Sequence, residues 1–225
     1  RELSYMGATV LHEDAIFPVR YAGIPINIKN TNAPEDAGTM IVASADEHDA
    51  ARCITGIAGK KGFSVITIEK DMMNGEIGFG RRVLEVLEDN EISFEHLPSG
   101  IDSMSIVVST ASLDGRRDKV IAGIGKVVKP DSIHVEDGLA LVAIVGRGMV
   151  KTRGTAARVF AAISRAGVNI RMTFMKSNSS STRTFECYMD ASFLSKMSDA
   201  LIERAIPFIE IEAARRSSTI PTLAT

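Results

Sequence analysis

The feature that most constrains this chain is an internal repeat with an offset of 76 residues. When Ile66 is placed over Val142, Gly78 falls on Gly154 without a gap. The other matched pairs are Val83 with Val159, Leu84 with Phe160, Leu87 with Ile163, Ile92 with Val168, Ser93 with Asn169 and Phe94 with Ile170. Self-similarity at a fixed offset indicates that one structural unit is present twice.

Both copies predict the same elements in the same order: a strand, a loop ending in glycine, an amphipathic helix and a second strand. The helix of copy one places Phe79 and Val83 on one face and Arg81 and Glu85 on the other. A third strand (104–109, 184–189) and a second helix (116–127, 192–205) follow in each copy, and copy one adds a fourth strand at 132–135. This βαββαβ order predicts an α+β fold of two ferredoxin-like units, whose open sheet edges favour pairing.

The first 50 residues lie outside the repeat. They predict a helix over 2–22 that Pro18 interrupts, a strand over 24–29, an extended piece over 38–42 and an acidic connector over 45–50. The chain does not begin with Met and starts inside a predicted helix, so we expect it to be a piece of a longer protein.

Composition excludes several classes of function. The 26 basic and 28 acidic residues give a net charge of -2, which offers no electrostatic reason to bind nucleic acid or a membrane surface. No apolar run approaches the ~20 residues of a membrane helix, and no secretion signal is present, so we expect a cytoplasmic location. Cys53 and Cys187 are interpreted as half-buried thiols. The four histidines lack ligand spacing, so no metal site is predicted, and no catalytic constellation is visible.

Two glycine-rich segments do not match nucleotide-binding motifs. Residues 56–62 precede a predicted strand and lack the phosphate-loop spacing, so they are interpreted as a bend into that strand. Residues 146–148 lack the third glycine of a dinucleotide site.

The loop over 71–79 is the one candidate binding site. It is interpreted either as a plain strand-to-helix connection or as a cradle for a free amino acid. Backbone N–H groups near Gly78 and Phe79 suit an α-carboxylate, and Glu95 can accept from an ammonium with Ser93 as a small polar wall. This hypothesis assumes that the second strand runs beside the first. Copy two has Arg171 where copy one has Glu95, so copy one is favoured for a cationic amino acid.

Several segments together resemble the aspartate kinases. Residues 3–12 look like the segment after the catalytic lobe, and residues 22–31 followed by Gly38 resemble the next family motif. Residues 54–58, 78–87 and 92–96 are similar to the first regulatory ACT domain of that family, and residues 137–146 and 154–160 to the second.

The resemblance implies two ACT domains, the first inserted into the second. The expected divisions are a helical connector over 1–23, a strand and linker of the second ACT domain over 24–50, the first ACT domain over 51–138 and the second over 139–225. The strand at 24–29 would complete the sheet of the second unit. After Met172 the sequence departs from the family pattern, which places effector binding by the second unit in doubt.

The resemblance also implies a function. The parent would transfer the ATP γ-phosphate to aspartate, with ATP and Mg in an upstream kinase lobe, and this piece would be inactive alone and carry no cofactor. It would form a homodimer through its ACT domains and bind an end-product amino acid, lysine first and threonine second. A ligand-free dimerisation module is the alternative. The family's lysine positions match Met73, Glu76, Gly78, Phe79, Ser93, Phe94 and Glu95.

Overall fold

The chain divides into two compact units, one of which interrupts the other in sequence. Residues 61–140 form the inserted unit, and residues 1–60 with 141–225 form the outer unit. The computed structural model describes residues 13–42, 54–146, 149, 152–177, 183–194, 196 and 208–211. Within these residues, no helix has the length and apolar character needed to cross a membrane.

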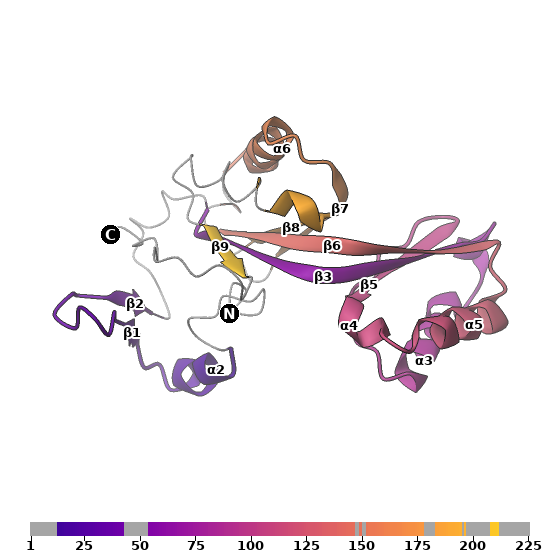
Figure 1. The fold of residues 1–225 in the computed structure, drawn as a ribbon, viewed down its shortest axis with the longest axis horizontal. Helices are drawn as coiled ribbons and strands as arrows, with labels where there is room; N and C mark the ends of the chain where they lie inside the picture. The colour runs from indigo at the N-terminus through magenta and orange to yellow at the C-terminus, as the bar shows by residue number, and fades with distance from the viewer. Residues whose placement is uncertain are drawn as a thin grey trace. The chain divides into compact units, whose positions relative to one another are not determined.

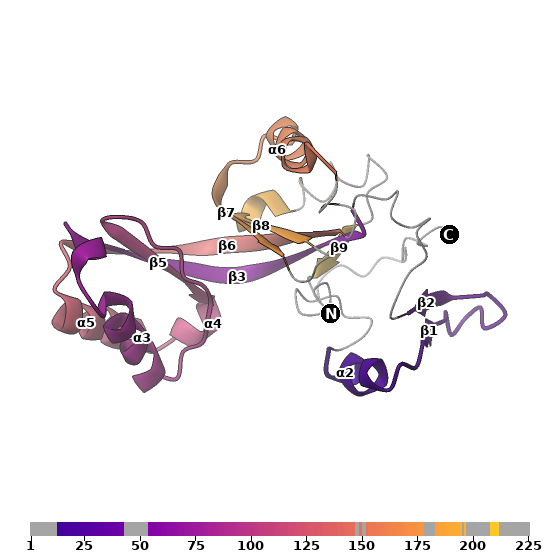
Figure 2. The same cartoon turned by 180° about the vertical axis from the view of Figure 1, so that it is seen from behind.

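The inserted unit has the predicted ferredoxin-like topology. Its elements are the second part of β3 (Gly56–Glu69), η2 (Met73–Gly75), α3 (Phe79–Asp89), β4 (Phe94–His96), β5 (Ser103–Ser109), α4 (Thr110–Leu113), α5 (Arg117–Val128) and the first part of β6 (Ser132–Gly146). The strand order is β4-β5-β3-β6, and β5 is antiparallel to both β3 and β4. Helices α3 and α5 cover one face of these strands (Figure 1 and, from behind, Figure 2). The fold class predicted from the sequence is therefore confirmed for this unit.

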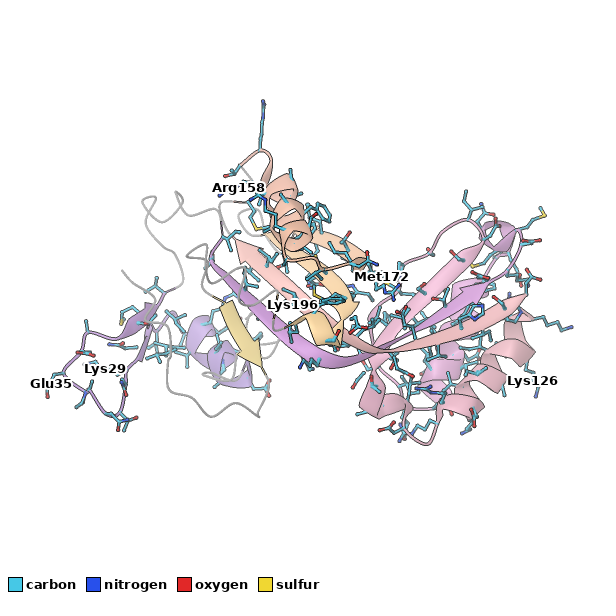
Figure 3. All side chains as sticks on the ribbon, turned by 45° about the horizontal axis from the view of Figure 1, so that its top comes forward. Lys29, Glu35, Lys126, Arg158, Met172 and Lys196 are labelled. Carbon is cyan, nitrogen blue, oxygen red and sulfur yellow. The ribbon has the colours of Figure 1, made fainter. Side chains whose placement is uncertain are left out.

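The core of the inserted unit follows from the amphipathic pattern of α3. The predicted apolar face is buried, with Val83 fully inaccessible and Phe79 only 4% exposed. Alternate residues of β3 and β5 meet this face, because successive strand side chains point to opposite sides of a sheet. Ile66 and Ile106 are cross-strand partners and are both inaccessible. Lys126, labelled in Figure 3, is exposed on α5.

The outer unit repeats the same design. Its elements are α2 (Glu13–Tyr21), β1 (Ile26–Ile28), β2 (Thr39–Ile41), the first residues of β3, the last residues of β6, α6 (Thr155–Arg165), β7 (Ile170–Ser177), β8 (Arg183–Asp190), η4 (Ala191–Phe193) and β9 (Phe208–Ile211). The strand order is β3-β6-β8-β7, and β9 runs parallel to β3 on its other side.

The 76-residue offset is confirmed at the level of backbone geometry. Helices α3 and α6 each have 11 residues and start at positions 79 and 155. Each follows a glycine in the left-handed region, Gly78 with φ 78° and Gly154 with φ 77°. A side chain would be strained there, so the two glycines are required by the entry into the helix.

The prediction that the strand near residue 26 completes the sheet of the second unit is wrong. Strand β1 pairs with β2 in a separate two-stranded sheet, in which Ile26 faces Ile41. The place beside β6 is taken by the first residues of β3. Gly38 holds the β1–β2 loop closed, because a Cβ at this position would lie 2.5 Å from the Ile28 carbonyl oxygen.

The fourth predicted strand of copy one and the first predicted strand of copy two are in fact one strand. Residues 132–135 and Val142 both belong to β6, which continues through Gly138 at φ 73°. The glycine-rich segment at 56–62 is likewise already strand, and only Gly62, at φ 92°, takes a conformation typical of a bend. Strands β3 and β6 each begin in one unit and end in the other. The boundaries of the inserted unit therefore fall within these strands, at residues 61 and 140, whereas the sequence predicted boundaries at 51 and 138.

Some predicted elements fall partly outside the described residues. The connector helix is seen as α2, with Pro18 inside it, while residues 1–12 lie outside. The second helix of copy two begins with η4, and most of its remaining residues lie outside, as does Cys53. Cys187 is fully buried rather than half-buried, and this burial raises the pKa of its thiol to about 12, so it is an inert core residue.

The packing of α3 against α5 makes a paired prediction on one helix. A Cβ added at Gly123 would lie 2.8 Å from Cγ1 of Val86, whereas one added at Gly125 would meet nothing within 4 Å. We expect Gly125→Ala to raise the free energy of unfolding by about 0.5–1 kcal/mol through helix propensity. Gly123→Ala should lose that gain and destabilise, because the branched Val86 side chain cannot move aside.

Urea denaturation of both variants measures this difference. Val86→Ala serves as the background control, since it should abolish the penalty at position 123 and leave the gain at position 125 unchanged. Equal stabilities of the two glycine variants would contradict the close helix approach.

Candidate functional site

The loop between β3 and α3 is fixed by hydrogen bonds to two other parts of the inserted unit. The backbone N–H of Met72 donates to Asp102 (2.8 Å), and that of Asp71 donates to Asp131 (2.7 Å). Asn74 donates through its backbone to the carbonyl of Ile101 (3.0 Å). Met72 has a left-handed backbone, with φ 59°. These hydrogen bonds tie the backbone of the loop to the segments around Asp102 and Asp131.

The start of α3 keeps backbone donors at its open end. Gly78 is the N-cap and has no side chain, so no side-chain hydrogen bond caps the helix. The first N–H groups of a helix have no partner within it, and they attract anions such as a carboxylate. The N–H of Phe79 already donates to the carbonyl of Glu76 (3.2 Å). The donors of the following residues are thus the ones suited to a ligand.

Glu76 is neutralised by the protein's own cations. Its carboxylate forms ion pairs with Lys70 and Arg82, and both cations are about three-quarters buried. The hydrogen bond from Lys70 holds the pKa of the Glu76 carboxyl below its ordinary value, and the charge of Arg82 acts in the same direction. Lys70 also donates to the carbonyl of Val128 (2.7 Å) and lies 5.7 Å from the Phe79 ring centre. Glu76 therefore braces the loop against α5.

The side chains of Met73 and Phe79 point into the protein. Each is 4% exposed and belongs to the hydrophobic core of the inserted unit. At these two positions a ligand meets backbone atoms rather than an exposed side chain.

The structure does not bring Ser93, Phe94 and Glu95 beside this loop within one unit. Strand β5 lies between β3 and β4, so the prediction that the second strand runs next to the first is wrong. Phe94 faces Val108, which faces Ser64 on β3. Ser64 is five positions before Glu69, where β3 ends and the loop begins. At ~3.3 Å per residue, Phe94 is therefore displaced from the start of the loop by roughly 16 Å along the strand direction. It is also displaced by two strand spacings of about 4.8 Å across the sheet.

Sequence reasoning missed the residues that hold the loop. Lys70, Arg82 and Asp102 make the contacts described above, yet none was named as a candidate. The only signal in the sequence is that Lys70 and Arg82 each stand six residues from Glu76. In a loop this spacing does not predict that the side chains are in contact. Among the described residues, no cluster of three or more His, Cys, Asp or Glu side chains could hold a metal.

Two ferredoxin-like units from one repeat, one inserted into the other, define the class of paired ACT domains. The ACT domain family matches residues 142–201 by sequence. Aspartokinase 3 of Bacillus subtilis is 44% identical over 173 residues, which are 76% of this chain and 38% of that protein. The chain belongs to the aspartokinase family and corresponds to its regulatory ACT region.

Solved structures agree with this assignment. The aspartate kinase of Clostridium acetobutylicum is 48% identical with a TM-score of 0.80, covering 90% of this chain and 45% of that one. E. coli aspartokinase III, solved in complex with lysine and aspartate, shares the fold at 22% identity and a TM-score of 0.65, over 90% of this chain and 44% of that one. The chain thus spans less than half the length of these relatives.

The ion pairs of Glu76 make a prediction about its titration. Lys70→Met should raise the pKa of Glu76 towards its ordinary value, because the hydrogen bond from Lys70 is the largest cause of the lowered pKa. A lowered pKa means that the pairing stabilises the fold at neutral pH and that this contribution is lost as the pH falls through the lowered pKa. Carbon-detected NMR titration of the carboxylate measures the shift.

Arg81→Met is the matched control, because Arg81 pairs with Glu85 on the exposed face of α3 (3.0 Å). It should leave the pKa of Glu76 unchanged. A Glu76 carboxylate that titrates identically in both variants would contradict the bracing role of Lys70.

Proposed function

We propose that this chain is the allosteric sensor of an aspartokinase and that it binds an end-product amino acid, lysine first and threonine second, between two copies of the inserted unit. The observation that carries the proposal is the separation of the two half-sites. Because β5 lies between them in one unit, a single pocket needs the loop of one copy and β4 of another. Strand β4 suits this role, since it is the edge of the sheet and Phe94 is 42% exposed.

The chemistry of the two half-sites fits a dipolar ligand. The N–H groups after Phe79 suit the α-carboxylate, as at other helix N-termini. Glu76 is already paired with two cations. The ligand ammonium is assigned to the carboxylate of Glu95 on the edge strand β4 of the opposite copy, with Ser93 beside it. Met73, Gly78 and Phe79 shape the wall from which the donors project. The lysine complex of E. coli aspartokinase III supports this choice of ligand class.

The rest of the protein follows as a proposal from its relatives. A kinase lobe upstream of this chain would hold ATP and Mg and transfer the γ-phosphate to the β-carboxylate of aspartate, and this chain alone would be inactive and bind no cofactor. The cytoplasmic location expected from the sequence stays a prediction. Lysine would favour one arrangement of the paired ACT domains, and the connector that includes α2 would pass this to the lobe. A coupling of about 1–3 kcal/mol is sufficient for useful inhibition.

A ligand-free dimerisation module is the second candidate. This candidate is favoured by the sequence after Met172, where residues 173–183 depart from the family pattern, and by the open edge strands. Light scattering separates the two functions: a dimer that responds to no amino acid favours the module, whereas a dimer strengthened by lysine favours the sensor.

The ammonium contact can be tested directly. Isothermal titration of the chain with lysine should give saturable heat, and Glu95→Ala should weaken binding by about 1.5–3 kcal/mol, because a charge-assisted hydrogen bond is lost. Glu88→Ala is the control, since Glu88 is exposed on α3 and should leave the affinity unchanged.

The outcomes test the ammonium contact and the sensing role separately. An unchanged affinity in Glu95→Ala would assign the ammonium to another residue. No heat and no thermal shift with lysine, threonine or methionine would end the sensing role and leave the dimerisation module.

A further inference from the structure

The outer unit contains a cavity at the start of α6, the place equivalent to the proposed half-site of the inserted unit. Its volume is about 280 Å³, and its residues come from α6, from the segment before it and from β7 and β8. The repeat places Met149 on Met73 and Thr152 on Glu76, and the two methionines are buried to the same degree (5% and 4% exposed). The two loops thus share a framework but not their charged side chains.

The ion pairs that hold the loop of the inserted unit have no counterpart among the matching residues of the outer unit. Position 146, which matches Lys70, is glycine, and Thr152 replaces Glu76. Arg158, which matches Arg82, has no carboxylate at the equivalent position and is exposed on α6, where Figure 3 labels it. Two long charged side chains of the inserted unit are therefore replaced by shorter, uncharged residues at the matching positions of the outer unit.

Two arginines give this cavity a strong positive charge. Arg153 and Arg183 line it, and neither guanidinium hydrogen-bonds or pairs with another described residue. The N-terminal end of α6 adds a partial positive charge, and Gly154 offers no side chain to cap it. A guanidinium binds a carboxylate through two parallel hydrogen bonds.

One part of the cavity wall is apolar. Val159 and Phe185 are 4% and 3% exposed, and the Phe185 ring packs edge-to-face against Phe160, with ring centres 5.2 Å apart. Met175 on β7 closes this side and is half exposed. A short hydrocarbon group suits this wall, because its burial removes apolar surface from water.

None of the described residues that line the cavity is acidic, so a ligand ammonium would meet two guanidinium groups there and none of these residues could offer it a carboxylate. We infer that the outer unit binds a small organic carboxylate that carries a short apolar chain and no ammonium group, such as a branched 2-oxo acid. This site is separate from the amino-acid site proposed for the inserted unit. Both ligands carry a carboxylate, but only the ligand of the inserted unit carries an ammonium group.

A matched pair of probes tests the inference on the full 225-residue chain. The 2-oxo acid 4-methyl-2-oxopentanoate and leucine share a carbon skeleton and differ in an oxo group against an ammonium. In isothermal titration we expect the oxo acid to bind at least tenfold more tightly than leucine. Arg183→Gln and Arg153→Gln should each weaken the oxo acid about tenfold, as expected for loss of a hydrogen bond to a charged group.

Arg165→Gln is the matched control, because Arg165 is exposed in the last turn of the same helix and does not line the cavity. It should leave the affinity within twofold, and circular dichroism should show all variants folded. Amide NMR shifts at Thr155 and Ala156 on addition of the oxo acid locate the site independently of the variants.

Three results would overturn the inference: equal affinity for leucine, affinity unchanged in both arginine variants, or no shift at the start of α6 at millimolar oxo acid. Lysine binding that is lost in Glu95→Ala while the oxo acid still binds separates this site from the proposed sensor. A chain that binds the oxo acid but no amino acid would sustain this inference and remove the sensor.

Discussion

Two long strands, β3 and β6, contribute to the sheets of both units, and the rest of the structure depends on this sharing. Strand β3 is buried at residues 56–59 and again mainly at 63–68, with exposed or half-exposed residues between, so one strand serves two cores. Strand β6 is likewise half-exposed before Gly138 and buried from Leu139 onward. Inside the inserted unit, the buried Ser64 hydroxyl donates to Asp137 (2.6 Å), and Arg117 reaches the same carboxylate (2.7 Å). These contacts lower the pKa of Asp137, the Ser64 bond most, and keep it a charged anchor between β3 and β6.

Much of the fold could be predicted because the repeat combines two independent signals. The periodicity of α3 and the glycine before it recur 76 residues later, and backbone conformations at Gly78 and Gly154 agree within one degree in φ. Strand order could not be read in the same way. Neighbours along the chain, such as the strand before α3 and the one after it, need not be neighbours in a sheet, and here β5 lies between them. The continuity of β6 could not be predicted because a glycine such as Gly138 usually indicates the end of a strand. A glycine with positive φ can nevertheless lie within a strand.

The candidate site was predictable only in its backbone part. The glycine-led helix start is a local feature, which sequence spacing can reveal. The bracing of the loop is not local, because Lys70 contacts a carbonyl 58 residues away and Asp71 a carboxylate 60 residues away. Glu76 therefore looked like a ligand-binding carboxylate in the sequence, while in the structure its charge is met within the protein.

The two copies of the repeat keep one backbone and differ in the charged side chains around it. In the inserted unit Glu76 is paired with two cations and Glu95 is the carboxylate of the proposed sensor. The matching positions of the outer unit are Thr152 and Arg171, and Arg153 of the cavity stands where the inserted unit has Ile77. A helix start attracts a carboxylate whichever copy provides it, so the side chains around it decide what else the ligand can carry. Carboxylates attract the ammonium group of a ligand, whereas guanidinium groups repel it. In the two proposed sites, this difference in charge would let one repeated framework distinguish an amino acid from its carbon skeleton.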